Sequence, residues 1–141
     1  MKQFIIPVLI MVFAAGCGNG GQKNTTDVSR SFRQIIDMHA GSADIRDTVD
    51  FGRMERGEQV EYNLGIRNAD TAVLVILNIV NGCGCTSLKY DKQPILPGDT
   101  ASIQLLYDSK GQHGFQMKTM QIVTTLDDEP HTVHLIADVR N

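Results

Sequence analysis

The sequence contains no tryptophan, and only three cysteines and four prolines among its 141 residues. Its 13 Lys and Arg side chains are scattered and the formal net charge is −3, so the basic patch of a nucleic-acid-binding protein is missing. The composition, 42% hydrophobic and 21% charged, is neither that of a disordered chain nor that of a membrane-spanning one. From the length and composition we therefore expect one ordinary globular domain with a short extension, and we do not expect a nucleic-acid partner.

The first 16 residues have the order of a secretory signal peptide. Lys2 supplies a positive charge, residues 4–13 (FIIPVLIMVF) are almost wholly apolar, and small residues at 14–16 precede Cys17. The apolar run is roughly 10 to 12 residues long, too short for the ~20 that cross a bilayer. We therefore expect residues 1–16 to be a signal peptide.

The Ala-Ala-Gly-Cys sequence that ends at Cys17 resembles the lipid-attachment motif of bacterial lipoproteins. The resemblance implies that Cys17 becomes the first residue of the mature chain and carries three acyl chains. Three acyl chains exceed the two hydrophobic signals that stable anchoring requires. Gly18, rather than Asp, follows, which by the same resemblance argues against retention in the inner membrane. We expect a lipid anchor in the outer membrane, with the protein facing the periplasm.

Residues 17–42 are expected to connect the lipid to the domain. Residues 18–27 contain three glycines and no apolar side chain, which is typical of a flexible tether. Apolar side chains in residues 29–40 have helical spacing, which favours a short amphipathic helix that ends at Gly41. A partly ordered extension that packs loosely on the domain explains the same pattern equally well, because isolated helices of this length are marginally stable.

Strand-like runs alternate with turn residues over 43–141, which predicts an all-β domain there. In residues 58–68, Val60, Tyr62 and Leu64 alternate with polar side chains, so one face of that strand is expected to be core. Residues 72–80 (AVLVILNIV) are continuously apolar and are expected to form a central strand covered on both faces. The seven expected strands are 45–51, 58–68, 72–80, 86–90, 100–107, 115–126 and 131–139.

Seven antiparallel strands in about 100 residues predict an immunoglobulin-like sandwich. The lack of tryptophan, and of a cysteine pair spaced to bridge two sheets, argues against an antibody-type domain. Pro97 and Gly98 are expected to form a turn. The acidic residues 127–129 before Pro130 are interpreted as a solvated turn rather than a calcium site.

Several motifs together resemble the bacterial DUF1573 family, over residues 44–139. They are Asp-Phe-Gly at 50–52, Gly57, the Asn68 turn, Cys83-Gly84-Cys85-Thr86, Pro97-Gly98-Asp99, and Gly114 with Lys118. The resemblance implies a secreted or lipid-anchored protein whose immunoglobulin-like sandwich is related to the ASH and PapD-like domains. The family is defined by unknown function, so the resemblance implies no activity.

Cys83 and Cys85, separated by Gly84, are the motif in which chemistry is most expected. Two extended residues span roughly 6.6 Å, at the upper limit of the Cα separation in a disulfide, and Gly84 could tighten the bend. So small a ring would remove little unfolded-state entropy. A bond here would therefore be an exchangeable disulfide in an oxidising compartment rather than a stability staple.

Other interpretations of the two thiols remain open. Two thiolates on one face suit Cu(I) or Zn(II), with His113 as a weak candidate for a third ligand. His131 and His134 differ by an odd number of strand residues, so only one of them could join. Alternatively, both cysteines are small, half-buried apolar residues in a turn. Catalysis would need a neighbouring base, and the sequence shows no such constellation.

The sequence therefore predicts a non-enzymatic, lipid-anchored envelope domain without a cofactor. Such a domain would bind or organise another envelope component through a sheet edge. The alternative is a thiol-based redox or metal-handling protein that acts through Cys83 and Cys85.

Overall fold

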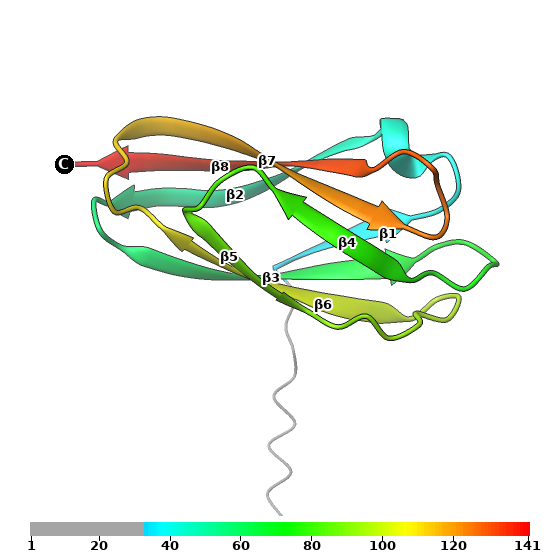
Figure 1. Cartoon of the computed structure of the whole chain (residues 1–141). Coiled ribbons are helices and arrows are strands. Elements are labelled where there is room, and N and C mark those ends of the chain that lie inside the picture. Colours follow the sequence, from blue (N-terminus) through cyan, green and yellow to red (C-terminus); the bar gives the residue numbers. More distant parts are fainter. Residues whose placement is uncertain (1–32) are drawn as a thin grey trace, which may run out of the picture.

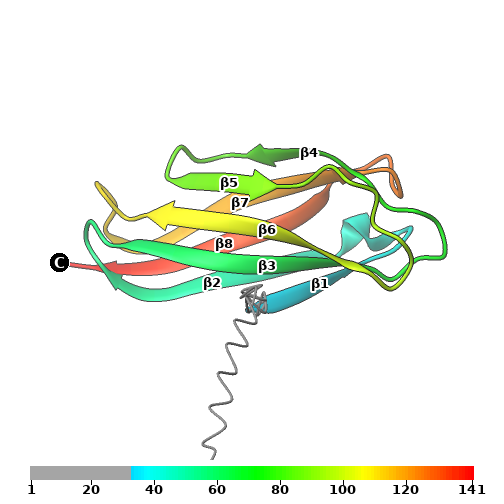
Figure 2. The same ribbon diagram turned by 90° about the horizontal axis from the view of Figure 1, so that it is seen from below.

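The computed structural model describes residues 33–141, which form two four-stranded sheets that lie one over the other (Figure 1). Sheet A has the order β1-β3-β6-β5 and sheet B the order β2-β8-β7-β4; Figure 2 shows sheet A from its outer side. The elements are β1 (Gln34–Met38), the 3-10 helix η1 (Ser42–Asp44), β2 (Arg46–Glu55), β3 (Gln59–Asn68), β4 (Ile76–Asn81), β5 (Thr86–Tyr90), β6 (Thr100–Asp108), β7 (Gly114–Thr124) and β8 (His131–Arg140). In this part of the chain, no helix has the length and apolar character of a membrane span.

The strands form because their side chains alternate between a buried and an outer face. β8 shows the pattern most clearly, with every second residue from His131 to Val139 buried. The inward side chains of both sheets meet in one hydrophobic core. Phe51 of β2 stacks on Tyr107 of β6 with ring centroids 4.9 Å apart, and meets the ring of Tyr62 edge-on at 5.6 Å. These aromatic contacts connect the two sheets.

Asn68, at the end of β3, holds three loop segments together from a fully buried position. Its side-chain Nδ2 donates to the carbonyl oxygens of Ala72 and Ile95, each at 2.8 Å, and its Oδ1 accepts the N–H of Asp70 at 2.9 Å. Its backbone oxygen accepts the N–H of Gly98 at 2.8 Å. The turn predicted at Asn68 is therefore a hydrogen-bonded junction between the β3–β4 and β5–β6 connections.

The all-β prediction is confirmed, and five expected strands correspond closely to β3, β5, β6, β7 and β8. The strand count was wrong, since the described residues contain eight strands. The expectation of purely antiparallel pairing was also wrong. β1 pairs parallel with β3, and β2 pairs parallel with β8. Alternation along a strand reveals its buried face but carries no information on the direction of its neighbour.

The helix expected over residues 29–40 is wrong where the structure describes those residues. β1 is a strand at the edge of sheet A, with Gln34 opposite Leu64. Ile36 and Met38 are buried in the core while Ile35 is exposed, a two-residue period that the helical interpretation overlooked. The remainder of that expectation, the tether residues before 33 and the signal peptide lie outside the described residues.

The central strand expected over residues 72–80 is also wrong. β4 spans Ile76–Asn81 and lies at the edge of sheet B, where among the described strands it pairs only with β7. Ile76 and Ile79 are buried, whereas Leu77 and Val80 are exposed. Residues before β4 form a connection in which Leu74 pairs with Ile95 in a single bridge. Continuous hydrophobicity therefore did not distinguish a central strand from an edge strand with an apolar outer side.

Replacing Asn68 should destabilise the fold strongly. We expect Asn68→Ala to lower the free energy of unfolding by about 2 to 4 kcal/mol, because two carbonyls and one N–H lose their partners. The control, Asn78→Ala, removes an exposed side chain of β4 and should stay within about 0.5 kcal/mol of the parent. Urea unfolding of both variants measures the difference, and equal midpoints would contradict the role of Asn68.

Acid should weaken the fold through specific carboxylates. The hydrogen bonds from Arg67, each 2.6 Å long, lower the pKa of Asp37. Hydrogen bonds from backbone N–H groups, first that of Ala40 and then that of Ala72, lower the pKa of Asp70. A carboxylate whose pKa is lower in the folded state stabilises the fold above its unfolded pKa of about 4, and this stabilisation is lost as pH falls through the folded pKa.

We therefore expect Asp37→Asn and Asp70→Asn to flatten the fall in melting temperature below about pH 4. The control is Asp128→Asn, because Asp128 is exposed and makes no side-chain hydrogen bond within the described residues. Thermal melts between neutral and acidic pH measure the effect. An unchanged acid slope in both variants would show that other groups cause the acid sensitivity.

Candidate functional site

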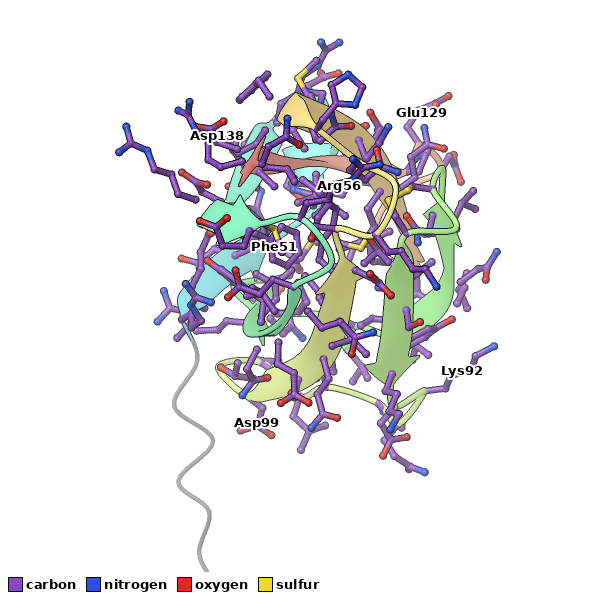
Figure 3. The ribbon with its side chains drawn as sticks, turned by 90° about the vertical axis from the view of Figure 1, so that its left-hand side faces the viewer. Phe51, Arg56, Lys92, Asp99, Glu129 and Asp138 are labelled. Carbon is purple, nitrogen blue, oxygen red and sulfur yellow. A yellow bond between two sulfur atoms is a disulfide. The ribbon has the colours of Figure 1, made fainter. Side chains whose placement is uncertain are left out.

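Residues 82–85 connect edge strand β4 of sheet B to edge strand β5 of sheet A. They lie at the end of the molecule that carries the β2–β3 and β6–β7 turns (left in Figure 1), which faces the viewer in Figure 3. In the structure Cys83 and Cys85 are joined by a disulfide, with their Cα atoms 5.2 Å apart. Both cysteines are half-buried, and Gly84 between them is exposed. The sulfur pair therefore lies at the surface, where two sheet edges meet.

Hydrogen bonds attach this loop to both sheets. Asn81 Nδ2 donates to the carbonyl oxygens of Cys83 at 2.8 Å and Thr86 at 2.7 Å. The N–H of Gly82 donates to Thr119 of β7 at 3.1 Å, and the N–H of Asp108 on β6 donates to the carbonyl of Cys85 at 2.8 Å. A Cβ atom at position 82 would lie 3.2 Å from the Thr119 oxygen, so glycine allows the close approach.

One N–H group inside the ring points at a sulfur. The backbone N–H of Cys85 donates to Cys83 Sγ at 3.0 Å. A donor in this position stabilises negative charge on Cys83 whenever the disulfide opens. Cys85 packs against the hydrophobic core and receives no such donor among the described groups. The two sulfurs therefore differ in the hydrogen-bond donors around them.

Two buried hydroxyl groups lie on β5, which begins at the loop, and on its neighbour β6. Thr86, directly after Cys85, is opposite Tyr107 in the β5–β6 pairing, and both are buried. Neither Thr86 Oγ1 nor the Tyr107 hydroxyl has a hydrogen-bond partner among the described residues. Burial also raises the pKa of Tyr107. These hydroxyls have unused hydrogen-bonding capacity beside the loop.

The structure does not gather the weak metal candidates around the cysteines. Within residues 33–141 no three His, Cys, Asp or Glu side chains are placed so that they could hold a metal ion. His113 is exposed in the β6–β7 turn. His131 is buried, with Nδ1 2.9 Å from the Ser42 oxygen and Nε2 2.8 Å from Asp47 Oδ2. Its ring connects η1, β2 and β8.

The predicted turns at residues 97–98 and at residues 127–129 lie at the far end of the molecule. Gly98, with a φ of 84°, follows Pro97 and donates its N–H to Asn68. Asp127 accepts the N–H of Gly41 at 2.7 Å, so this acidic residue connects the β7–β8 turn to the residue before η1. Neither turn lies beside the disulfide loop, and both stabilise connections.

The sequence reasoning overlooked a strand segment that lies beside the loop. β8 pairs with β7 from Gly114 to Ile122, but β4 reaches along β7 only as far as Met120. Residues 114–118 therefore have no strand on their second side in the described part of the chain; Figure 1 shows this half of β7 running past the end of β4. Phe115 is 68% exposed and Met117 60% exposed, more than the other large apolar side chains described. In the sequence, the alternation of Phe115 and Met117 with polar residues could have indicated a strand face with exposed apolar side chains.

Comparison with solved structures shows the fold. The structure is similar to a protein of unknown function from Porphyromonas gingivalis W83, with 16% identity and a TM-score of 0.58 over 66% of this chain and 44% of that one. It is also similar to the VesB protease of Vibrio cholerae, with 13% identity and a TM-score of 0.56 over 66% of this chain and 30% of that one. The chain thus spans less than half the length of either. Among curated proteins, none matches.

The family comparison agrees with the motifs. The DUF1573 family model, described as a protein of unknown function, matches residues 44–139. This range contains the disulfide loop, the Asn68 junction and the uncovered half of β7, and it makes up more than half of the sequence. The chain therefore belongs to the DUF1573 family.

Proposed function

We propose that this protein is a lipid-anchored, non-catalytic domain of the cell envelope that binds another envelope component through a sheet edge. The observation that carries the proposal is the uncovered half of β7, where strand backbone and two exposed apolar side chains lie together. Apolar side chains on an unpaired strand favour pairing with another chain. A binding role accounts for their exposure.

The architecture supports the same proposal. Two sheets facing each other across one core suit an immunoglobulin-like sandwich of the ASH or PapD-like kind, and sandwiches of this kind bind extended segments by strand addition. His131 and Asp70, two side chains with acid–base chemistry, are engaged in holding the fold. The leader and Cys17 support placement at a membrane.

Anchoring can be tested at Cys17. We expect the full chain expressed in a double-membraned bacterium to be recovered with the outer membrane, with an intact mass that includes three acyl chains. Cys17→Ser should move the protein to the soluble fraction without acylation. The matched control is Cys83→Ser, which should remain with the membrane. Recovery of the unmodified parent chain in the soluble fraction would contradict the proposal.

A second candidate function, thiol–disulfide exchange, is favoured by the N–H that points from Cys85 to Cys83 Sγ. A thiolate of a partner dithiol would attack Cys85 Sγ, forming a mixed disulfide and releasing the Cys83 thiolate. The second thiol of the partner would then displace Cys85, so two electrons pass to this protein and the partner becomes a disulfide.

This asymmetry gives a direct prediction. Cys85→Ala keeps the backbone N–H beside Cys83, so the Cys83 thiol should react with iodoacetamide at neutral pH about tenfold faster than the Cys85 thiol left in Cys83→Ala. Mass spectrometry of timed samples measures both rates. Equal rates, or faster reaction of Cys85, would remove the basis for directed exchange.

A further inference from the structure

We propose that residues 114–118 of β7 form a docking edge for an extended segment of a partner protein, with apolar side chains at alternate positions and acidic residues beside them. The proposal rests on the binding function above and deepens it by naming the strand and the chemistry of the partner.

The backbone of the docking edge is oriented to accept a strand. The Thr119 oxygen accepts the N–H of Gly82 at the end of β4, so the main-chain groups of Thr119 point away from β8. In an antiparallel ladder the N–H and C=O of one residue point to the same side, and successive residues alternate. Phe115 and Met117 therefore also direct their main-chain groups away from β8. A partner strand would continue sheet B beyond the point where β4 ends.

The side chains of the docking edge supply the apolar contact. Phe115 and Met117 lie on the outer face of sheet B. Met117 is opposite Ile136 of β8, which is half-buried on the same face. A strand added beside β7 would place its outward side chains against this apolar group. Every second side chain of the partner strand would contact Phe115 and Met117. The proposed segment therefore has apolar residues at alternate positions.

The free edges of β2 and β5 carry features that discourage strand pairing, whereas the docking edge has no bulge and has its one lysine, Lys118, only at its last position. β2 has a register shift between Asp50 and Arg53, with Gly52 at a φ of 81°. β5 has five residues, with exposed Lys89 at its outer face. Bulges, short length and lysine are common protections of an edge. The pairing of β7 with β8 runs without a shift from Gly114 to Ile122, and residues 114–117 carry no charge.

The charge around the docking edge favours an acidic partner. Residues 109–118 (SKGQHGFQMK) contain Lys110 and Lys118 and no Asp or Glu, in a chain whose net charge is −3. The carboxylate opposite Phe115, that of Asp138, is bound by Arg53 at 3.8 Å and by Arg140. Acidic residues that flank the partner strand would gain attraction here. A second copy of this basic segment would instead be repelled.

The test uses the full chain in detergent and a synthetic peptide with valine at alternate positions and a glutamate at each end. We expect the peptide to slow hydrogen exchange at the amides of Phe115 and Met117. Met117→Pro removes the N–H that faces the partner and should weaken peptide binding by about tenfold or more. Because proline could disturb folding, Phe115→Ser combined with Met117→Ser provides a second variant that keeps the backbone.

Two controls distinguish specific binding at the docking edge from nonspecific hydrophobic binding. Leu77→Ser removes another exposed apolar residue, 48% exposed, from β4 of the same sheet, and binding should stay within about twofold. Lys110→Glu should weaken binding of the peptide with glutamate ends and strengthen binding of a peptide with lysine ends. Only charge complementarity produces this reversal.

Three outcomes would overturn the proposal. The peptide could protect β5 instead of β7, the chain could dimerise through Met117 without peptide, or the two amides could already be protected by another segment of the same chain. The peptide assay does not depend on Cys17. Loss of peptide binding therefore contradicts the docking edge, and loss of membrane recovery contradicts envelope anchoring, each independently of the other. A soluble Cys17 variant that still binds the peptide would support the docking edge alone.

Discussion

Burial of one face of each sheet against the other is the constraint on which the rest of the structure depends. Phe51, Tyr107 and Leu135 belong to a core that both sheets share, and a fully buried large apolar side chain contributes roughly 1.5 to 3 kcal/mol. The central strands β3, β6 and β8 contribute to the core along most of their length, whereas β7 contributes only Met120 and Ile122 among the described core residues. Edge strands need to cover the core only in part, so their free sides are available for binding.

Asparagine side chains close the connections at both ends of the molecule by the same chemistry. Asn68 and Asn81 each stand at the end of a strand, each donates from Nδ2 to two carbonyl oxygens, and each accepts a backbone N–H at Oδ1. The amide group suits this position because it carries two donors and an acceptor at one site. Asn68 connects loops among themselves, whereas Asn81 supports the disulfide loop.

The length difference between β4 and β7 connects the disulfide loop with the docking edge. The chain leaves sheet B at Gly82, immediately after its last bond to Thr119, and the disulfide ring follows. The same departure ends the cover on β7 and exposes Phe115 and Met117. The loop therefore marks one end of the proposed binding strand, whether or not its sulfurs exchange. Binding and thiol chemistry would be neighbours at this end of the sandwich.

Period-two alternation in residues 58–68 was sufficient to predict β3 and its buried face, because the pattern is local to the strand; strand-like runs between turn residues predicted β6 and β8. The motifs were sufficient to recognise the family, and the Cys83–Cys85 spacing to place a candidate site. Tertiary structure decided which strands lie at an edge, that β1 and β2 pair in parallel, and that β4 stops short of Phe115. These features depend on partners distant in sequence, and a strand carries the same pattern whether one neighbour covers it or two.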